Sequence, residues 1–331
     1  MEINFTHKQS AHCENGVVSN LMRFNGFEVS EPMVFGIGSG LLFSYLPFLK
    51  VNHAPVVTYR AMPGTIFNRF AKRTGVKIKR EKFSTAQKAK ARLDENLEKN
   101  NPVGLQVGVY NLVYFPEEYR FHFNAHNMVV YGKKEGRYLI SDPVMEEVTS
   151  LSEKELEKVR FAKGAFAPKG HMYYPIEFPD KLELKKAIVK GIRHTCKDMT
   201  APVPLVGVKA IRKIAKLIRK WPAKKGVKTA NHYLGQIVRM QEEIGTGGGG
   251  FRYIYGAFLQ EASKILENDQ LSTLSKEITQ IGDLWRDFAV DASRIYKNRS
   301  ATEDGYNKVA DQLATIADKE EAFFKKLKKA V

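Results

Sequence analysis

The pattern of apolar residues changes once along this 331-residue chain, near Pro179. Before that point, short strand-like runs alternate with helical segments and turn signals. After it, apolar residues recur almost throughout at the three- and four-residue spacing of an α-helix. We therefore predict an α+β fold in two parts: a mixed first domain, residues 1–179, and an all-α, basic second domain, residues 180–331.

In the first domain, Val17, Leu21 and Phe24 share one face of a predicted helix over residues 13–25, which Gly26 ends. Residues 127–131 and 138–141 form the two strands of a predicted β-hairpin, joined by a polar turn with glycine. Further helices are predicted over residues 65–74, 86–100 and 151–157, and strands over 103–109 and 172–178. In the second domain, helices are predicted over residues 182–195, 205–221, 227–244, 251–266, 271–297 and 302–328.

The chain has only two cysteines, Cys13 and Cys196, which argues against a secreted protein held together by disulfides. The first residues lack the charged and apolar regions of a signal peptide. Apolar runs such as residues 103–115 are too short and too polar to span a bilayer. We therefore expect a cytoplasmic protein with reduced thiols. The histidines show no HExxH or CxxC spacing, so no metal is expected.

Cys13, His126 and Asp142 are the candidate catalytic residues. Cys13 begins the first predicted helix, where the free N–H groups and partial positive charge of the helix terminus favour a thiolate. His126 begins one strand of the predicted hairpin and Asp142 ends the next. These two positions lie side by side in an antiparallel pair, so the carboxylate can orient the imidazole as the base of a thiol triad.

Two nearby residues are weaker candidates for support of this triad. His12 precedes the thiol, and could tune its pKa, cap the helix or lie exposed. An oxyanion needs donors, for which we consider the backbone N–H of Cys13 and, less strongly, the side chain of Gln9. Cys196 lies in the basic helical part without an obvious base, so we interpret it as structural.

Three segments resemble the butirosin biosynthesis protein H family. Residues 12–45, HCENGVVSNLMRFNGFEVSEPMVFGIGSGLLFSY, resemble its N-terminal signature, with a His-Cys pair, a Ser-Glu pair and a glycine-rich segment. Residues 126–143, HNMVVYGKKEGRYLISDP, resemble its His/Asp hairpin, which is also similar to that of the double-glycine leader peptidases. Residues 244–262, IGTGGGGFRYIYGAFLQEA, resemble the helical domain that often follows.

The resemblance implies a papain-like cysteine-peptidase-type N-terminal domain followed by a helical domain. It also implies an acyltransferase that takes an acyl group from an acyl carrier protein. By position, Cys13 would carry the acyl group, His126 would act as base and Asp142 would orient it. The phosphopantetheine arm would arrive with the carrier protein, so no bound cofactor is expected. The acceptor would be a small molecule bearing an amine or hydroxyl, in secondary-metabolite or lipid biosynthesis.

Two glycine-rich segments have open interpretations. The first either lines an acyl pocket or makes a tight turn under the first helix; its glycines are Gly36, Gly38 and Gly40. The second precedes a predicted helix and either holds a phosphate of phosphopantetheine or serves as a linker or lid. Its candidate contacts are Gly247, Gly248, Gly249 and Arg252.

The net charge is +17, and residues 185–228 contain 14 lysines and arginines against the single acid Asp198. Such a block favours an acidic partner. Within it, residues 205–221 form a cationic amphipathic helix whose charged residues are Lys209, Arg212, Lys213, Lys216, Arg219 and Lys220. Docking of an acidic acyl carrier protein, peripheral contact with a membrane, and an ordinary solvated face all fit this helix. No nucleic-acid-binding motif accompanies the charge.

Three functions remain open at this point. The first is the carrier-dependent acyltransferase, and the second is a cysteine peptidase or amide hydrolase with the same triad. The third is a non-catalytic relative that binds a carrier protein on an old enzyme fold. The sequence leaves the identity of the acyl donor and acceptor, and the oligomeric state, undetermined.

Overall fold

The computed structural model describes residues 2–331 and divides them into two compact units. The first unit contains the residues up to Val34 and Phe70–Glu183, and the second contains Phe35–Arg69 and Leu184–Val331. This division differs from the predicted one, which had a single boundary between residues 179 and 180, because residues 35–69 belong with the helical part. This segment includes a two-stranded hairpin, which is too small to bury an apolar face by itself.

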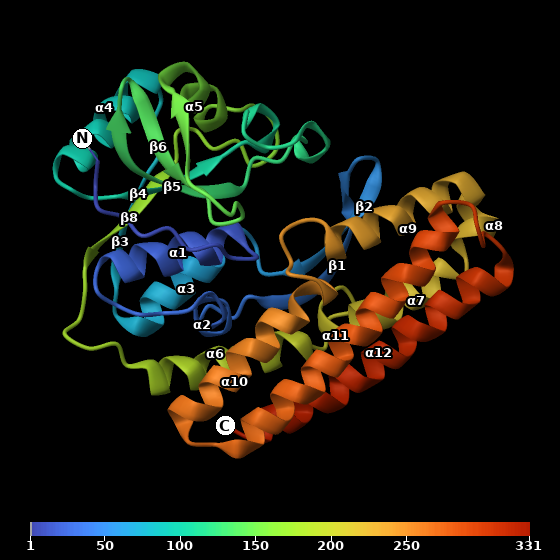
Figure 1. Cartoon of the computed structure of the whole chain (residues 1–331). Helices are drawn as coiled ribbons and strands as arrows, with labels where there is room; N and C mark the ends of the chain where they lie inside the picture. Colours follow the sequence, from blue (N-terminus) through green and yellow to red (C-terminus); the bar gives the residue numbers. More distant parts are fainter. Residues whose placement is uncertain (1) are drawn as a thin grey trace. The chain divides into compact units, whose positions relative to one another are not determined.

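The first unit is built on a six-stranded sheet in which all neighbouring strands are antiparallel, in the order β3-β8-β4-β5-β6-β7. The strands are β3 Lys77–Glu81, β4 Val103–Val107, β5 His126–Lys134, β6 Arg137–Ser141, β7 Thr149–Ser152 and β8 Met172–Glu177. The predicted hairpin is present as β5 and β6. In Figure 1, β5 and β6 are green and lie side by side in the sheet.

The helices associated with the first unit are α1 Cys13–Phe24, α4 Ala86–Glu98 and α5 Glu153–Arg160, with short 3-10 turns η1 Val109–Asn111 and η2 Glu117–Tyr119. Helices α2 Glu31–Ile37 and α3 Thr65–Thr74 cross the boundaries between the units. The core under the sheet includes Leu105, Met128 and Val130, each fully buried. Burial of such a side chain contributes about 1.5–3 kcal/mol, which holds β4 and β5 in register.

The second unit is a helical bundle with one β-hairpin. Its helices are α6 Leu184–Met199, α7 Gly207–Ile218, α8 Trp221–Lys225, α9 Val227–Glu242, η3 Gly249–Phe251, α10 Arg252–Leu266, α11 Asp269–Tyr296 and α12 Glu303–Lys329, and its strands are β1 Leu41–Val51 and β2 Ala54–Arg60. Helices α11 and α12 run side by side over most of their length (Figure 1). The predicted helix over residues 205–221 is present as α7, which ends three residues earlier than predicted, and the short helix α8 begins at Trp221. The ring of Pro222 would clash with the carbonyl of Ile218, and α7 ends at that residue.

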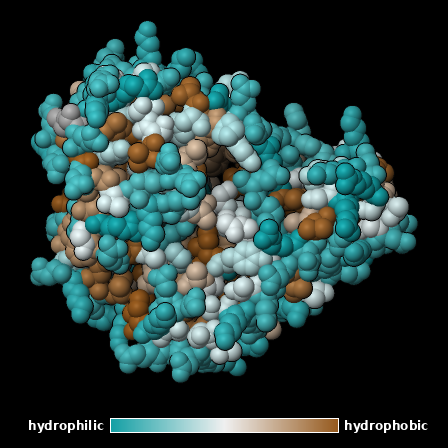
Figure 2. Space-filling model, in the orientation of Figure 1, coloured by the Kyte–Doolittle hydropathy of each residue, from teal (hydrophilic) through white to brown (hydrophobic). Residues whose placement is uncertain are grey.

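The helices of this unit are amphipathic, as their sequence spacing predicts. In α12, the buried stripe includes Val309, Leu313, Ile316 and Phe323. Hydrophilic residues cover most of the visible face of the bundle in Figure 2. Within residues 2–331, none of the helices combines the length and apolar character that a membrane span requires.

Candidate active site

Cys13 is the first residue of α1, and hydrogen bonds to the side chains of His12 and Glu31 hold the backbone next to it. His12 is the N-cap residue, and its Nδ1 accepts a hydrogen bond of 3.4 Å from the Asn15 backbone N–H. Of the three roles considered for His12, the structure shows that of a cap at the start of α1. The cysteine side chain is 7% exposed. The sulfur therefore lies at the positive end of the helix, where a thiolate is favoured.

Glu31, at the start of α2, holds the segment that leads into Cys13. Its carboxylate accepts the backbone N–H groups of Ala11, at 3.0 Å, and His12, at 2.7 Å. Burial raises the pKa of Glu31, and these two hydrogen bonds oppose that effect. Ser30 caps α2 by accepting from the Met33 N–H at 3.2 Å. The approach of the chain to the thiol is thus set by hydrogen bonds rather than by packing alone.

His126 and Asp142 meet at one edge of the sheet because β5 and β6 are antiparallel neighbours, with Val129 opposite Ser141. The Nε2 atom of His126 lies 2.6 Å from Asp142 Oδ2, and both side chains are buried. Burial by itself lowers the pKa of His126. The charges of Asp142 and Cys13, and hydrogen bonds to both, outweigh it and raise the pKa to about 10. Because Nε2 is hydrogen-bonded to Asp142, Nδ1 is the ring nitrogen that is available to Cys13 Sγ.

Tyr114 is a residue of this site that the sequence did not indicate. Its hydroxyl donates to Asp142 Oδ2 at 2.7 Å, while the backbone N–H of Val144 donates to Oδ1 at 3.2 Å. Burial and the Asp142 charge raise the pKa of Tyr114 well above its usual value, so the phenol stays protonated as a donor. Tyr114 lies in a loop without periodic pattern, and nothing in its sequence context predicts this contact.

Near the sulfur, the structure places an amide that sequence analysis did not single out. Asn127 Nδ2 lies 3.7 Å from Cys13 Sγ, and Asn127 is buried. Gln9, the side-chain donor that we considered, is exposed in the segment before α1. The second cysteine, Cys196, is fully buried, and burial raises the pKa of its thiol to about 12. Cys196 therefore remains a neutral thiol at neutral pH.

The glycines expected to line an acyl pocket have a packing role. A Cβ at Gly36 would lie 2.1 Å from the ring of Phe258, and one at Gly40 would lie 2.2 Å from the ring of Phe35. Gly38 lies in the turn between α2 and β1. A side chain at Gly36 or Gly40 would collide with an aromatic ring, so both glycines permit close packing; whether the segment lines an acyl pocket stays a prediction.

The second glycine segment does not present the phosphate site that we considered. Arg252 is fully buried, and its guanidinium forms two hydrogen bonds with Glu320, at 2.8 and 3.0 Å. The backbone N–H of Gly248 donates to Thr246 Oγ1, and that of Gly249 donates to Glu242. Gly247 has a left-handed φ of 66° within the same turn. The Gly248 and Gly249 N–H groups and the Arg252 guanidinium are therefore already hydrogen-bonded within the second unit.

The basic residues in and just after α7 fall into two groups. Arg212 pairs with Asp318 at 2.7 Å and with Glu321, and Arg219 pairs with Asp311, so α12 neutralises both arginines. The four lysines of the expected docking set have no acidic partner recorded among residues 2–331; they are Lys209, Lys213, Lys216 and Lys220.

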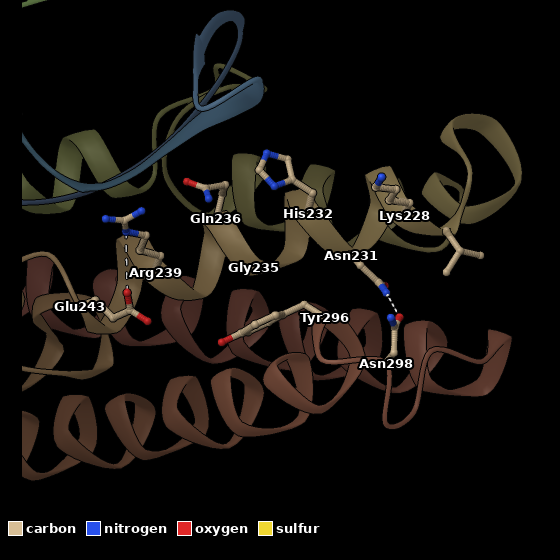
Figure 3. Close-up of a pocket in the computed structure, with 10 residues that line it drawn as sticks. Lys228, Asn231, His232, Gly235, Gln236, Arg239, Glu243, Tyr296 and Asn298 are labelled. Atoms are coloured by element: carbon tan, nitrogen blue, oxygen red, sulfur yellow. Dashed lines mark hydrogen bonds and ion pairs between the residues drawn. The ribbon is translucent and has the colours of Figure 1, made fainter. Parts of the chain in front are cut away.

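A groove of about 770 Å³ runs along one face of α9 and ends near Tyr296 at the end of α11. In Figure 3, His232, Gln236 and Arg239 lie along the helix, with Tyr296 across from Gly235. Arg239 is paired with Glu243 at 3.7 Å. None of the triad residues lines this groove, so it is separate from the candidate active site.

A cysteine at the start of a helix, facing a histidine and an aspartate on an antiparallel sheet, defines a papain-like cysteine enzyme. A family model described as "Butirosin biosynthesis protein H, N-terminal" matches residues 12–143, and "Domain of unknown function (DUF4872)" matches residues 154–327. The chain belongs to the butirosin biosynthesis protein H family, with a papain-like N-terminal domain followed by this second domain. The predicted family and fold class are thereby confirmed.

Among solved structures, the chain is similar to a protein described as a C39-like peptidase from Bacillus anthracis. The two share 11% sequence identity, with a TM-score of 0.38, over 54% of this chain and 98% of the other. An overlap at that level carries no conclusion about activity. No curated protein matches the chain.

Proposed function

We propose that the protein is an acyltransferase that forms an acyl-enzyme on Cys13. The observation that supports this most directly is the link from the buried Asp142 through His126 to Cys13 at the helix N-terminus. Such a link supplies a base of fixed orientation and a favoured thiolate, which nucleophilic catalysis by cysteine requires.

In the proposed reaction, His126 Nδ1 takes the proton of the thiol, and Sγ attacks the carbonyl carbon of an acyl thioester. The donor's carbon–sulfur bond breaks, and its thiolate leaves with the proton from His126. An amine or hydroxyl acceptor then attacks the acyl-enzyme. His126 accepts the acceptor's proton as the carbon–Sγ bond breaks, and passes it to Cys13. Asp142 stabilises the imidazolium in both steps.

We propose an acidic acyl carrier protein as the donor, with the acyl group on its phosphopantetheine. Four lysines in and just after α7, which have no acidic partner among residues 2–331, support this, because positive charge accelerates encounter with an acidic partner. The family's association with butirosin biosynthesis supports a small-molecule acceptor in secondary metabolism. A peripheral contact of the same lysines with a membrane is the alternative use of this surface.

Incubation with an acetyl-loaded carrier protein, followed by intact mass, tests the proposal. We expect an acetyl adduct on the wild type and on Cys196→Ala, but none on Cys13→Ala. An adduct on Cys13→Ala would overturn it. With the adduct formed, release of free acid at the same rate with and without an amine acceptor would favour an amide hydrolase. A wild type without any adduct would point to a binding protein.

A further inference from the structure

A second chain of polar groups, distinct from the link through Asp142 and His126, reaches the Cys13 sulfur. It consists of Asn127 in β5 and Tyr173 in β8, both buried. Asn127 Nδ2 is 3.7 Å from Sγ, and the Tyr173 hydroxyl is 2.7 Å from Asn127 Oδ1. The triad described above accounts for neither residue.

The orientation of the Asn127 amide follows from its neighbours. Nδ2 lies 3.1 Å from the backbone oxygen of Ala125. A carbonyl oxygen can only accept, so the atom facing it must be the amide nitrogen. The oxygen end then accepts from Tyr173, whose hydroxyl donates. The Ala125 carbonyl fixes this orientation, and the hydroxyl of Tyr173, which can donate or accept, is compatible with it. The second N–H of the amide is then left for the sulfur.

The position of Tyr173 depends on a glycine in the strand between β8 and β5. Tyr173 is opposite Gly104 of β4, and a Cβ on Gly104 would lie 2.4 Å from the tyrosine ring. The ring therefore lies across β4 toward β5 in space that only glycine leaves. On the other side, Arg80 of β3 is the cross-strand partner of Tyr173, with its guanidinium 5.2 Å from the ring centroid. The ring is thus held from both neighbouring strands.

We propose that Asn127 stabilises the thiolate of Cys13 and that Tyr173 is its positioning residue. This rests on the proposed function, in which Cys13 is the nucleophile. A donor that faces sulfur favours its charged form and lowers the thiol pKa. The same N–H acts again when the acceptor attacks the acyl-enzyme. The carbon–Sγ bond then breaks with its electron pair on sulfur, and Asn127 stabilises that leaving thiolate.

The thiol pKa, obtained from the pH dependence of alkylation by iodoacetamide in a Cys196→Ala background, tests this inference. Asn127→Leu keeps the volume but removes the donor, and we expect it to raise the thiol pKa by about one unit, equivalent to tenfold slower alkylation at low pH. Tyr173→Phe removes the hydroxyl that donates to Asn127 Oδ1, so the amide is held by the Ala125 carbonyl alone. It should shift the pKa in the same direction by a smaller amount.

The matched control is Asn96→Leu. Asn96 is another buried amide, which donates to the Arg92 carbonyl oxygen in α4. It should leave the thiol pKa unchanged. If Asn127→Leu lowers stability in urea but both Asn127→Leu and Tyr173→Phe keep the wild-type thiol pKa, the two residues are structural and the inference is wrong. If instead wild-type Cys13 titrates as a free cysteine and takes no acyl group, the proposed function itself fails.

Discussion

The Tyr114 hydroxyl and His126 Nε2 converge on the same oxygen of Asp142, at 2.7 and 2.6 Å. The carboxylate is fully buried, so these contacts and the Val144 N–H replace the water that would otherwise solvate it. The orientation of the imidazole is therefore coupled to a tyrosine in a loop.

We expect Tyr114→Phe to slow acyl-enzyme formation about tenfold and to lower the free energy of unfolding by about 1–3 kcal/mol, since a buried carboxylate loses one donor. Intact mass over time gives the rate, and urea unfolding gives the stability. The matched control is Tyr119→Phe, because Tyr119 is 57% exposed. A Tyr114→Phe variant that behaves like this control would show that the hydroxyl does not support Asp142.

Gly16, in the first turn of α1, sets how closely that helix approaches the residue after Asp142. A Cβ at Gly16 would lie 2.5 Å from Pro143 Cβ and 2.7 Å from Ser10 Cβ. We expect Gly16→Ala to push the start of α1 away, to destabilise the protein by about 1–3 kcal/mol and to slow acyl-enzyme formation. Thermal and urea unfolding, together with the intact-mass assay, measure these effects.

The control for that substitution is Gly235→Ala in α9, where a Cβ would make an ordinary contact of 3.4 Å with the Tyr296 ring. Alanine is the better helix former, so this variant should be neutral or more stable by up to about 1 kcal/mol. Equal behaviour of the two variants would contradict the close approach at Gly16.

Because the pKa of His126 is raised in the folded protein, we expect the free energy of unfolding to fall as the pH rises. In the unfolded chain the imidazole titrates near 6.5, and in the folded protein its pKa is about 10. A raised pKa contributes stability that is fully present below pH 6.5 and is lost as the pH rises toward 10. We therefore expect the wild type to lose more free energy of unfolding than His126→Gln between pH 6 and pH 9, measured in urea. Parallel losses in the two proteins would argue against the ion pair.

The buried pair of Arg252 and Glu320 predicts a stability effect rather than a binding effect. Trp285 Nε1 also donates to Glu320, at 2.7 Å, and all three side chains are fully buried. Arg252→Met should lower the free energy of unfolding by about 3–5 kcal/mol, because it leaves a buried carboxylate without its countercharge. Removing both charges, in Arg252→Met/Glu320→Leu, should restore much of that loss.

The contrasting variant is Arg212→Met, which removes an ion pair with the exposed Asp318. Urea unfolding should place it within about 1 kcal/mol of the wild type. If Arg252→Met were equally mild, the pair would not hold the second unit together.

Much of the fold was predictable from local pattern. The helix over residues 13–25 appears as Cys13–Phe24, and the hairpin over residues 127–141 appears as β5 and β6. These elements carry their own periodicity and their own end signals. The segment 35–69 was not assigned correctly, because its strands bury their faces against helices that lie more than a hundred residues further along the chain.

The residues of the candidate site also separate into those that local pattern predicts and those that only distant contacts bring together. Cys13 was recognisable from its place at a helix start, and His126 with Asp142 from antiparallel pairing; their catalytic role stays a prediction. Tyr114, Asn127 and Tyr173 were not recognisable. Each acts through a contact between segments that no local pattern relates, such as the passage of the Tyr173 ring over Gly104. Arg252 was misassigned for a similar reason, since its partner Glu320 is 68 positions away.

The sequence by itself determined most of the helices and the β5–β6 hairpin, and that a cysteine, a histidine and an aspartate stand at the ends of such elements. These features depend on spacing within one element or across one turn. The tertiary structure decided which polar groups surround the sulfur and the carboxylate. That choice depends on how distant strands align and how closely they pack. A hydrogen bond requires its atoms to lie within a few tenths of an ångström of the right position, and chain spacing does not specify this.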